Sequence, residues 1–117
     1  MNNPRVMSPR VLRVETTPTG GRRWHCEVPF DLTPLEGHFR DFPLVAGVCQ
    51  LRWVTDCYRE WTGEDAAVQQ LVRLKFQQFL RPGDPFCITL ERRGDAVHFA
   101  LTHDQTQYAS GRLVLRK

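Results

Sequence analysis

A histidine at a loop-to-helix junction is the residue of this chain best suited to chemistry. His38 lies in an apolar stretch rich in proline, and Gly47 follows it at the start of a predicted helix. Free backbone N–H groups around Gly47 and Val48 create positive potential at that helix N-terminus. They suit a thioester carbonyl and the enolate that forms when the adjacent carbon loses a proton. His38 is then the expected general base, since an imidazole changes charge near neutrality.

Other candidate side chains are weaker. His25, His98 and His103 fall in strand patterns, where a single histidine is most often a surface or core residue. Cys49 follows the helix start, but no partnered base is evident and burial is the commoner fate of such a thiol. The cysteines lack a Cys-x-x-Cys pair, so we predict free, buried thiols and no metal site.

The elements that must position His38 follow from alternation and turn chemistry. Alternating patterns predict strands over residues 11–16, 22–28, 67–80, 85–91, 96–103 and 107–115. A wide apolar stripe predicts one helix over residues 47–61, buried on most of its circumference and ended by Gly63. Because a single apolar helix interrupts the strands, we expect an α+β fold in which an antiparallel sheet curls around that helix.

Size and composition bound the remaining possibilities. The chain has 117 residues, which suits one domain over residues 10–117 after a flexible N-terminus over residues 1–9. Its net charge of +3 comes from scattered basic residues, which suit solvated strand surface or an acidic partner protein. No motif for nucleic acid accompanies them. No apolar run could span a bilayer, so a cytoplasmic location is expected.

A family resemblance rests on the same stretch. Gly37-His38-Phe39, Pro43 and Gly47-Val48 resemble the active-site signature of the 3-hydroxyacyl-acyl-carrier-protein dehydratases of fatty-acid biosynthesis. Lys75-Phe76 and Arg81-Pro82-Gly83-Asp84 resemble that family's central strand and the turn after it. The continuation Gln50-Leu51-x-Trp53 is more similar to dehydratase-like members associated with aryl-polyene pigment clusters. The resemblance covers about residues 25–115.

The resemblance implies a hot-dog fold, an antiparallel β-sheet wrapped around one long central α-helix. It also implies a homodimer or higher homo-oligomer with two sites at the subunit interface, each binding an acyl thioester on an acyl carrier protein. His38 and Gly47 are then catalytic, and Phe39, Pro43 and Val48 contact the substrate. The phosphopantetheine of the carrier protein bears the substrate, and no further cofactor is implied.

The chain departs from the family pattern on the helix. Arg52 stands where the family has a catalytic Asp or Glu, and a guanidinium cannot protonate a departing hydroxyl. Asp56 lies one turn further on, at i+4. Three interpretations stay open: the two side chains form an exposed ion pair, Asp56 replaces the acid, or Arg52 binds an acidic group of the substrate or the phosphopantetheine. Arg40 and Ala46 also replace prolines that would stiffen the loop.

Three functions therefore remain in view. The leading one is dehydration of a 3-hydroxyacyl thioester, with His38 as the base and Asp56 as the acid. In the second, a hot-dog thioesterase, Asp56 assists the attack of water. In the third, the chain binds the acyl thioester without turnover, as one subunit of a heterodimer whose other subunit supplies the carboxylate.

Overall fold

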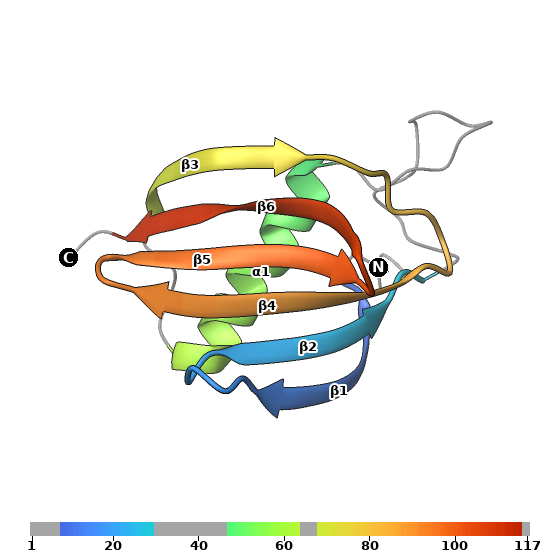
Figure 1. Ribbon diagram of the computed structural model, residues 1–117, viewed down its shortest axis with the longest axis horizontal. Coiled ribbons are helices and arrows are strands. Elements are labelled where there is room, and N and C mark those ends of the chain that lie inside the picture. Colours follow the sequence, from blue (N-terminus) through green and yellow to red (C-terminus); the bar gives the residue numbers. More distant parts are fainter. Residues whose placement is uncertain (1–7, 30–46, 64–67, 116–117) are drawn as a thin grey trace, which may run out of the picture.

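The described residues form a single antiparallel sheet with one helix across its inner face (Figure 1). The computed structural model describes residues 8–29, 47–63 and 68–115. The elements in chain order are β1 (Arg10–Thr16), β2 (Arg22–Glu27), α1 (Gly47–Thr62), β3 (Val68–Phe76), β4 (Pro85–Arg93), β5 (Ala96–His103) and β6 (Thr106–Leu115). The predicted order of two strands, one helix and four strands is confirmed, and with it the α+β class.

The sheet has six strands in the order β1-β2-β4-β5-β6-β3, so β1 and β3 are its two edges. β4, β5 and β6 follow one another as neighbours, joined by tight turns in which Gly94 and Asp104 have positive φ. β3 comes earlier in the chain than β4, yet it pairs with β6 at the far edge. The chain that leaves α1 therefore enters the sheet at the edge opposite to β1 and β2.

Alternation of burial along β2, β4 and β5 separates an inner face from an outer face. The inward side chains of β4 and β5 are fully or almost fully buried: Phe86, Ile88, Leu90, Val97, Phe99 and Leu101. Trp53 of α1 stacks on Phe86, with ring centroids 5.6 Å apart and planes 21° from parallel. The core thus lies between α1 and the inner face, and the outer face carries the polar side chains.

The helix is fixed to the sheet by a polar contact as well as by apolar packing. The indole Nε1 of Trp24, on β2, donates to Oε2 of Glu60 over 2.8 Å. Gly63, with φ 76°, ends the helix as predicted, and its N–H bonds the carbonyl of Arg59. Within the described part of the chain, no helix is long and apolar enough to cross a membrane.

The strand predicted over residues 67–80 is too long. β3 ends at Phe76, because Gln77 and Gln78 turn their N–H groups onto the single carbonyl of Tyr108 and leave the ladder. Leu80 then enters the core and is completely buried. Its apolar side chain therefore serves core packing outside the sheet. The expected flexible N-terminus falls mainly on residues 1–7, outside the described residues, and β1 begins at Arg10.

The turn between β1 and β2 contains two adjacent glycines with different roles. Gly20 has φ 88°, which L side chains rarely adopt, but a Cβ there would meet no atom within 4 Å. At Gly21 a Cβ would lie 2.2 Å from the backbone carbonyl oxygen of Leu90 on β4. The first glycine therefore serves the turn, and the second allows close approach of two backbones.

We predict that Gly21→Ala lowers the free energy of unfolding by about 3 kcal/mol or more, because a backbone atom of β4 has to move. Gly20→Ala is the matched control, and its left-handed backbone costs about 1–2 kcal/mol. Urea denaturation of both variants measures the difference. Equal losses would show that the contact with Leu90 does not constrain the sheet.

Candidate functional site

The N-terminus of α1 meets the end of β3 at Gly47. A Cβ at this position would lie 3.0 Å from Cζ of Phe76, so only glycine leaves the aromatic ring undisturbed against the helix start. The first turn of α1 contains no acidic residue that would neutralise its positive end. The backbone N–H groups expected to hold a carbonyl oxygen are therefore not masked by a carboxylate of their own turn.

Several predicted site residues fall outside the described residues. These are His38, Phe39 and Pro43, together with the side chain of Val48, whose backbone belongs to α1. Their predicted roles stay predictions. The described part of the site is its helical side, which consists of Gly47, Arg52 and Asp56.

Arg52 and Asp56 both face outward on α1, with Arg52 exposed and Asp56 partly exposed. The carboxylate of Asp56 pairs with Arg59, at 3.5 Å, and not with Arg52. This pair is largely exposed and contributes little to stability. The ion pair between Arg52 and Asp56 that the sequence left open is therefore replaced by one within the next turn.

The position of Asp56 along α1 limits what it can do within its own chain. At a rise of about 1.5 Å per residue, it begins about 13 Å from Gly47, whereas Arg52 begins about 7 Å away. The reacting hydroxyl of a 3-hydroxyacyl thioester is only two carbons from the carbonyl carbon. A substrate held at the N–H groups of Gly47 cannot also contact Asp56 of the same subunit.

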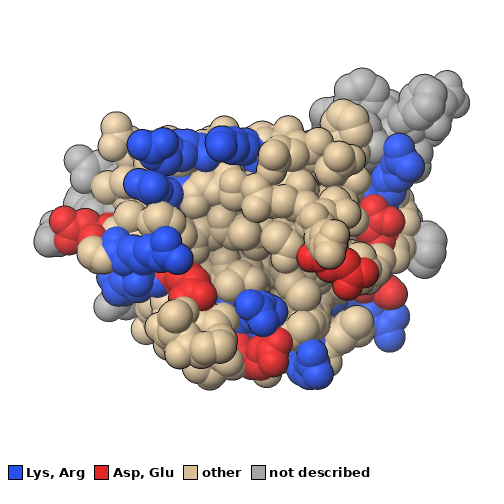
Figure 2. Space-filling model, viewed as in Figure 1, with Lys and Arg blue, Asp and Glu red and all other residues tan. Residues whose placement is uncertain are grey.

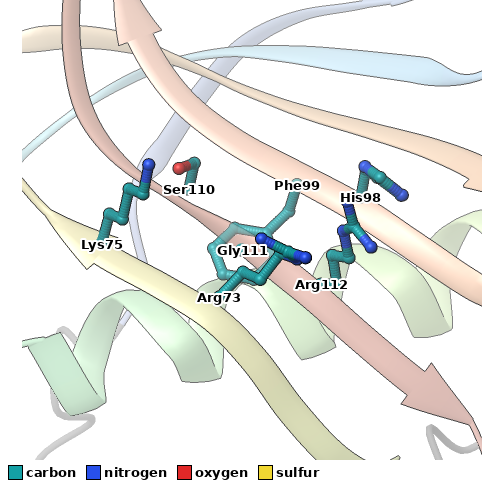
Figure 3. Close-up of a pocket in the computed structure, with 7 residues that line it drawn as sticks. All are labelled: Arg73, Lys75, His98, Phe99, Ser110, Gly111 and Arg112. Carbon is teal, nitrogen blue, oxygen red and sulfur yellow. The ribbon is translucent and has the colours of Figure 1, made fainter.

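A cavity opens on the outer face of the sheet and is distinct from the predicted site. It has a volume of about 310 Å³ and is lined by Arg73, Lys75, His98, Phe99, Ser110, Gly111 and Arg112 (Figure 3). We call it the cationic hollow. It lies over β3, β6 and β5, where Lys and Arg gather on the surface (Figure 2). Of the predicted site residues that the structure describes, Gly47, Arg52 and Asp56, none lines it.

The cationic hollow concentrates positive charge. Among the described residues, none of Arg73, Lys75 and Arg112 lies within ion-pairing distance of a carboxylate. Burial, followed by the charges of Arg112 and Arg93, lowers the pKa of His98. Arg73 has φ 55° at a bulge of β3, a costly backbone for a side chain other than glycine. The hollow thus presents uncompensated positive charge from described residues.

The charged residues of this hollow can be seen in the sequence, but the sequence alone does not show that they lie together. Outward positions carry the charges: Lys75 lies opposite Ser110, and Arg112 lies opposite His98. Finding the cluster required the knowledge that β3 pairs with β6. From the sequence, these residues were predicted to be scattered surface charges. The strand order brings them together.

The four cysteines are free thiols, as predicted. Cys49 is only 6% exposed, and burial raises its pKa to about 11, which agrees with its expected inert role. His25 is a partly exposed strand histidine that contacts Glu15 at 2.5 Å and Cys87 at 3.2 Å. Within the described residues, no three metal-ligating side chains cluster.

Solved structures share this fold. The chain has a TM-score of 0.84 and 22% identity to the dehydratase heterocomplex ApeI:P from Xenorhabdus doucetiae, covering 93% of this chain and 98% of the other. An uncharacterized protein from Erwinia carotovora subsp. atroseptica gives a TM-score of 0.74 and 24% identity, covering 92% and 95%. The dehydratase domain of the polyketide PpsC from Mycobacterium tuberculosis gives 0.68 and 20%, covering 98% of this chain and 46% of that one.

These likenesses confirm the hot-dog fold predicted from the sequence. A search of curated proteins found no match. The family described as ApeI-like, ApeI dehydratase, matches residues 15–112, which is most of the chain and includes α1, β3, β4, β5 and most of β6. This chain belongs to the ApeI-like dehydratase family.

Proposed function

We propose that this protein dehydrates a 3-hydroxyacyl thioester carried on an acyl carrier protein, giving the 2-enoyl thioester and water. The family match over residues 15–112 is the observation that carries the proposal. The glycine that begins α1, with no acidic residue in the first turn, supports it from the structure. Together they support a site for the thioester carbonyl at the start of α1, which follows the His38 segment in the sequence.

In the proposed reaction, His38 removes a proton from the carbon between the carbonyl and the hydroxyl-bearing carbon. The N–H groups of Gly47 and Val48 hold the carbonyl oxygen as it gains negative charge. The electron pair then forms the new double bond as the hydroxyl leaves the next carbon, and a proton delivered to that hydroxyl gives water. The reaction therefore needs an acid in addition to His38.

In this proposal, a second subunit supplies the acid. At the free edge of the sheet, β3 exposes apolar side chains, namely Leu71, Leu74 and Phe76, with Phe76 49% exposed. β1 also exposes apolar residues, but only β3 ends beside Gly47. We infer a homodimer joined at β3, in which Asp56 of one subunit serves the Gly47 site of the other.

One observation favours a second candidate assembly. Arg52 stands on the exposed side of α1 in place of the family's carboxylate, and a solved relative is a dehydratase heterocomplex. In this candidate, a different hot-dog subunit supplies the acid. Arg52 of this chain then binds an anionic group of the substrate or of its carrier.

We predict that the purified protein converts a 3-hydroxyacyl carrier-protein substrate to its 2-enoyl product, measured by mass spectrometry of the acyl carrier. His38→Ala should lower the rate by about a hundredfold or more, since the base is lost. His103→Ala, at the end of β5, is the matched control and should retain activity.

Each outcome of this assay decides between the functions. Loss of turnover in Asp56→Asn as well as in His38→Ala would support the homodimer. Release of free acid with a new thiol would replace dehydration by thioester hydrolysis. Binding without turnover by the isolated chain would contradict the homodimer and favour the heterocomplex.

We further propose that the cationic hollow receives the acidic surface of the carrier protein. Three cations that have no carboxylate partner within the described part of the chain are held around a hollow of about 310 Å³ and offer charge complementarity to such a surface. Such contacts mainly raise the rate of association and are weakened by salt.

Charge reversal tests this docking role. The variant Lys75→Glu/Arg112→Glu should raise KM for the carrier-bound substrate by about tenfold or more, with little change in kcat. The same variant should leave the turnover of a short pantetheine thioester unchanged. Arg22→Glu, on β2, is the matched control. Equal KM changes for both substrates would contradict a docking role.

A further inference from the structure

A cysteine, a histidine and a glutamate from three neighbouring strands form a chain of contacts on the outer face of the sheet. The Sγ of Cys87, on β4, lies 3.2 Å from Nδ1 of His25, on β2. The Nε2 of His25 lies 2.5 Å from Oε2 of Glu15, on β1. His25 and Cys87 are direct cross-strand partners. We call these three residues the outer-face triad.

The two ring nitrogens of His25 face different neighbours. The hydrogen bond from His25 is the largest of the interactions that lower the pKa of Glu15, and the charges of Arg13 and Arg23 act in the same direction. Glu15 is therefore a carboxylate and accepts the proton of Nε2. Arg13 also lies 3.1 Å from Nε2, but the charge-assisted contact with Glu15 is the shorter one.

This arrangement leaves Nδ1 of His25 with a lone pair directed at the thiol. A neutral imidazole that donates from Nε2 accepts at Nδ1, so Cys87 is the donor to it. A thiol bonded to a base that a carboxylate orients is the general signature of an activated nucleophile. The outer-face triad has this order: Cys87, His25 and Glu15.

Cys87 differs from the other three cysteines. Cys26, Cys49 and Cys57 are buried on the inner side, and burial raises the pKa of Cys26 to about 12 and that of Cys49 to about 11. Cys87 is partly exposed. Burial raises its pKa as well, although Arg23 and Arg13 oppose the rise while Glu15 and Asp104 add to it. Its reactivity near neutral pH therefore depends on the adjacent base.

The surroundings favour one class of electrophile. Acyl transfer needs donors for a developing oxyanion. β2 and β4 are interior strands, paired on both sides, so their N–H groups are committed to the ladders. Attack on a disulfide needs no such donors, because the charge develops on sulfur. The nearby guanidinium groups of Arg13 and Arg23 suit an anionic disulfide.

From this geometry we propose that Cys87 is a site of thiol–disulfide exchange with small anionic disulfides, with His25 as its base and Glu15 as the positioning residue. His25 takes the thiol proton as Sγ attacks one sulfur of the disulfide, whose S–S bond breaks. The departing thiolate takes the proton from His25. Cys87 is oxidised to a mixed disulfide, and the other half of the reagent is reduced to a thiol.

The test uses glutathione disulfide as the probe and follows the folded protein by intact mass and peptide mapping at pH 7. We expect one glutathione adduct, located at Cys87 and absent in Cys87→Ser. His25→Asn should slow its formation by about tenfold or more. Glu15→Gln should slow it by less, because it removes only the orientation of the imidazole.

His98→Asn is the matched control, since His98 is a half-buried outward histidine on β5. It should react like the unaltered protein. Circular dichroism of each variant identifies any loss of folding. A second variant, Arg13→Gln, leaves the triad in place. It should weaken the preference for glutathione disulfide over the cationic disulfide cystamine.

Two results would overturn the proposal. The first is a folded His25→Asn variant that reacts as fast as the unaltered protein. The second is an adduct located at Cys26, Cys49 or Cys57 in place of Cys87. Neither result depends on dehydratase turnover, so the outcome is separate from that of the proposed function.

Discussion

The packing of α1 across the inner face of the sheet is the constraint on which the rest of the structure depends. Trp53 stacks on Phe86, and the indole of the completely buried Trp24 donates to Glu60 of the helix. Fully burying a large apolar side chain contributes roughly 1.5–3 kcal/mol. The apolar contact prevents the helix from leaving the sheet, and the polar contact fixes its position along the sheet. Gly47 is consequently held against Phe76 at the end of β3.

This packing also divides the chemistry between the two faces. The inner face is filled by side chains, and the start of α1 is the point at which backbone N–H groups become available for a ligand. The outer face is left to charged and polar residues, which the strand order gathers into two separate groups. The cationic hollow lies over β3, β5 and β6, and the outer-face triad lies over β1, β2 and β4.

Local signals predicted the elements well. The stripe containing Trp53 and the stop at Gly63 gave the helix, and turn residues separated the strands. The strand predicted to reach residue 80 ends earlier, because Leu80 packs into the core outside the sheet. Phe76 is half exposed because it lies on the edge strand β3.

The candidate site was only partly predictable, because its members depend on long-range pairing. The pattern around Gly47 identified the family, which the match over residues 15–112 confirms. Asp56 was predicted from its spacing to Arg52, but its pairing with Arg59 depends on side-chain positions that spacing does not determine. His25, Cys87 and Glu15 are far apart in the sequence, and only the strand register makes them neighbours.

The central claim is that His38 removes a proton from the carbon next to a thioester carbonyl held at the start of α1. Proton exchange at that carbon tests it directly, because exchange needs the base and the carbonyl site but not the acid. With a 3-hydroxyacyl pantetheine thioester in D2O, the protein should introduce deuterium at this carbon, and His38→Ala should not. Equal incorporation by both proteins, or none by the unaltered protein, would contradict the account.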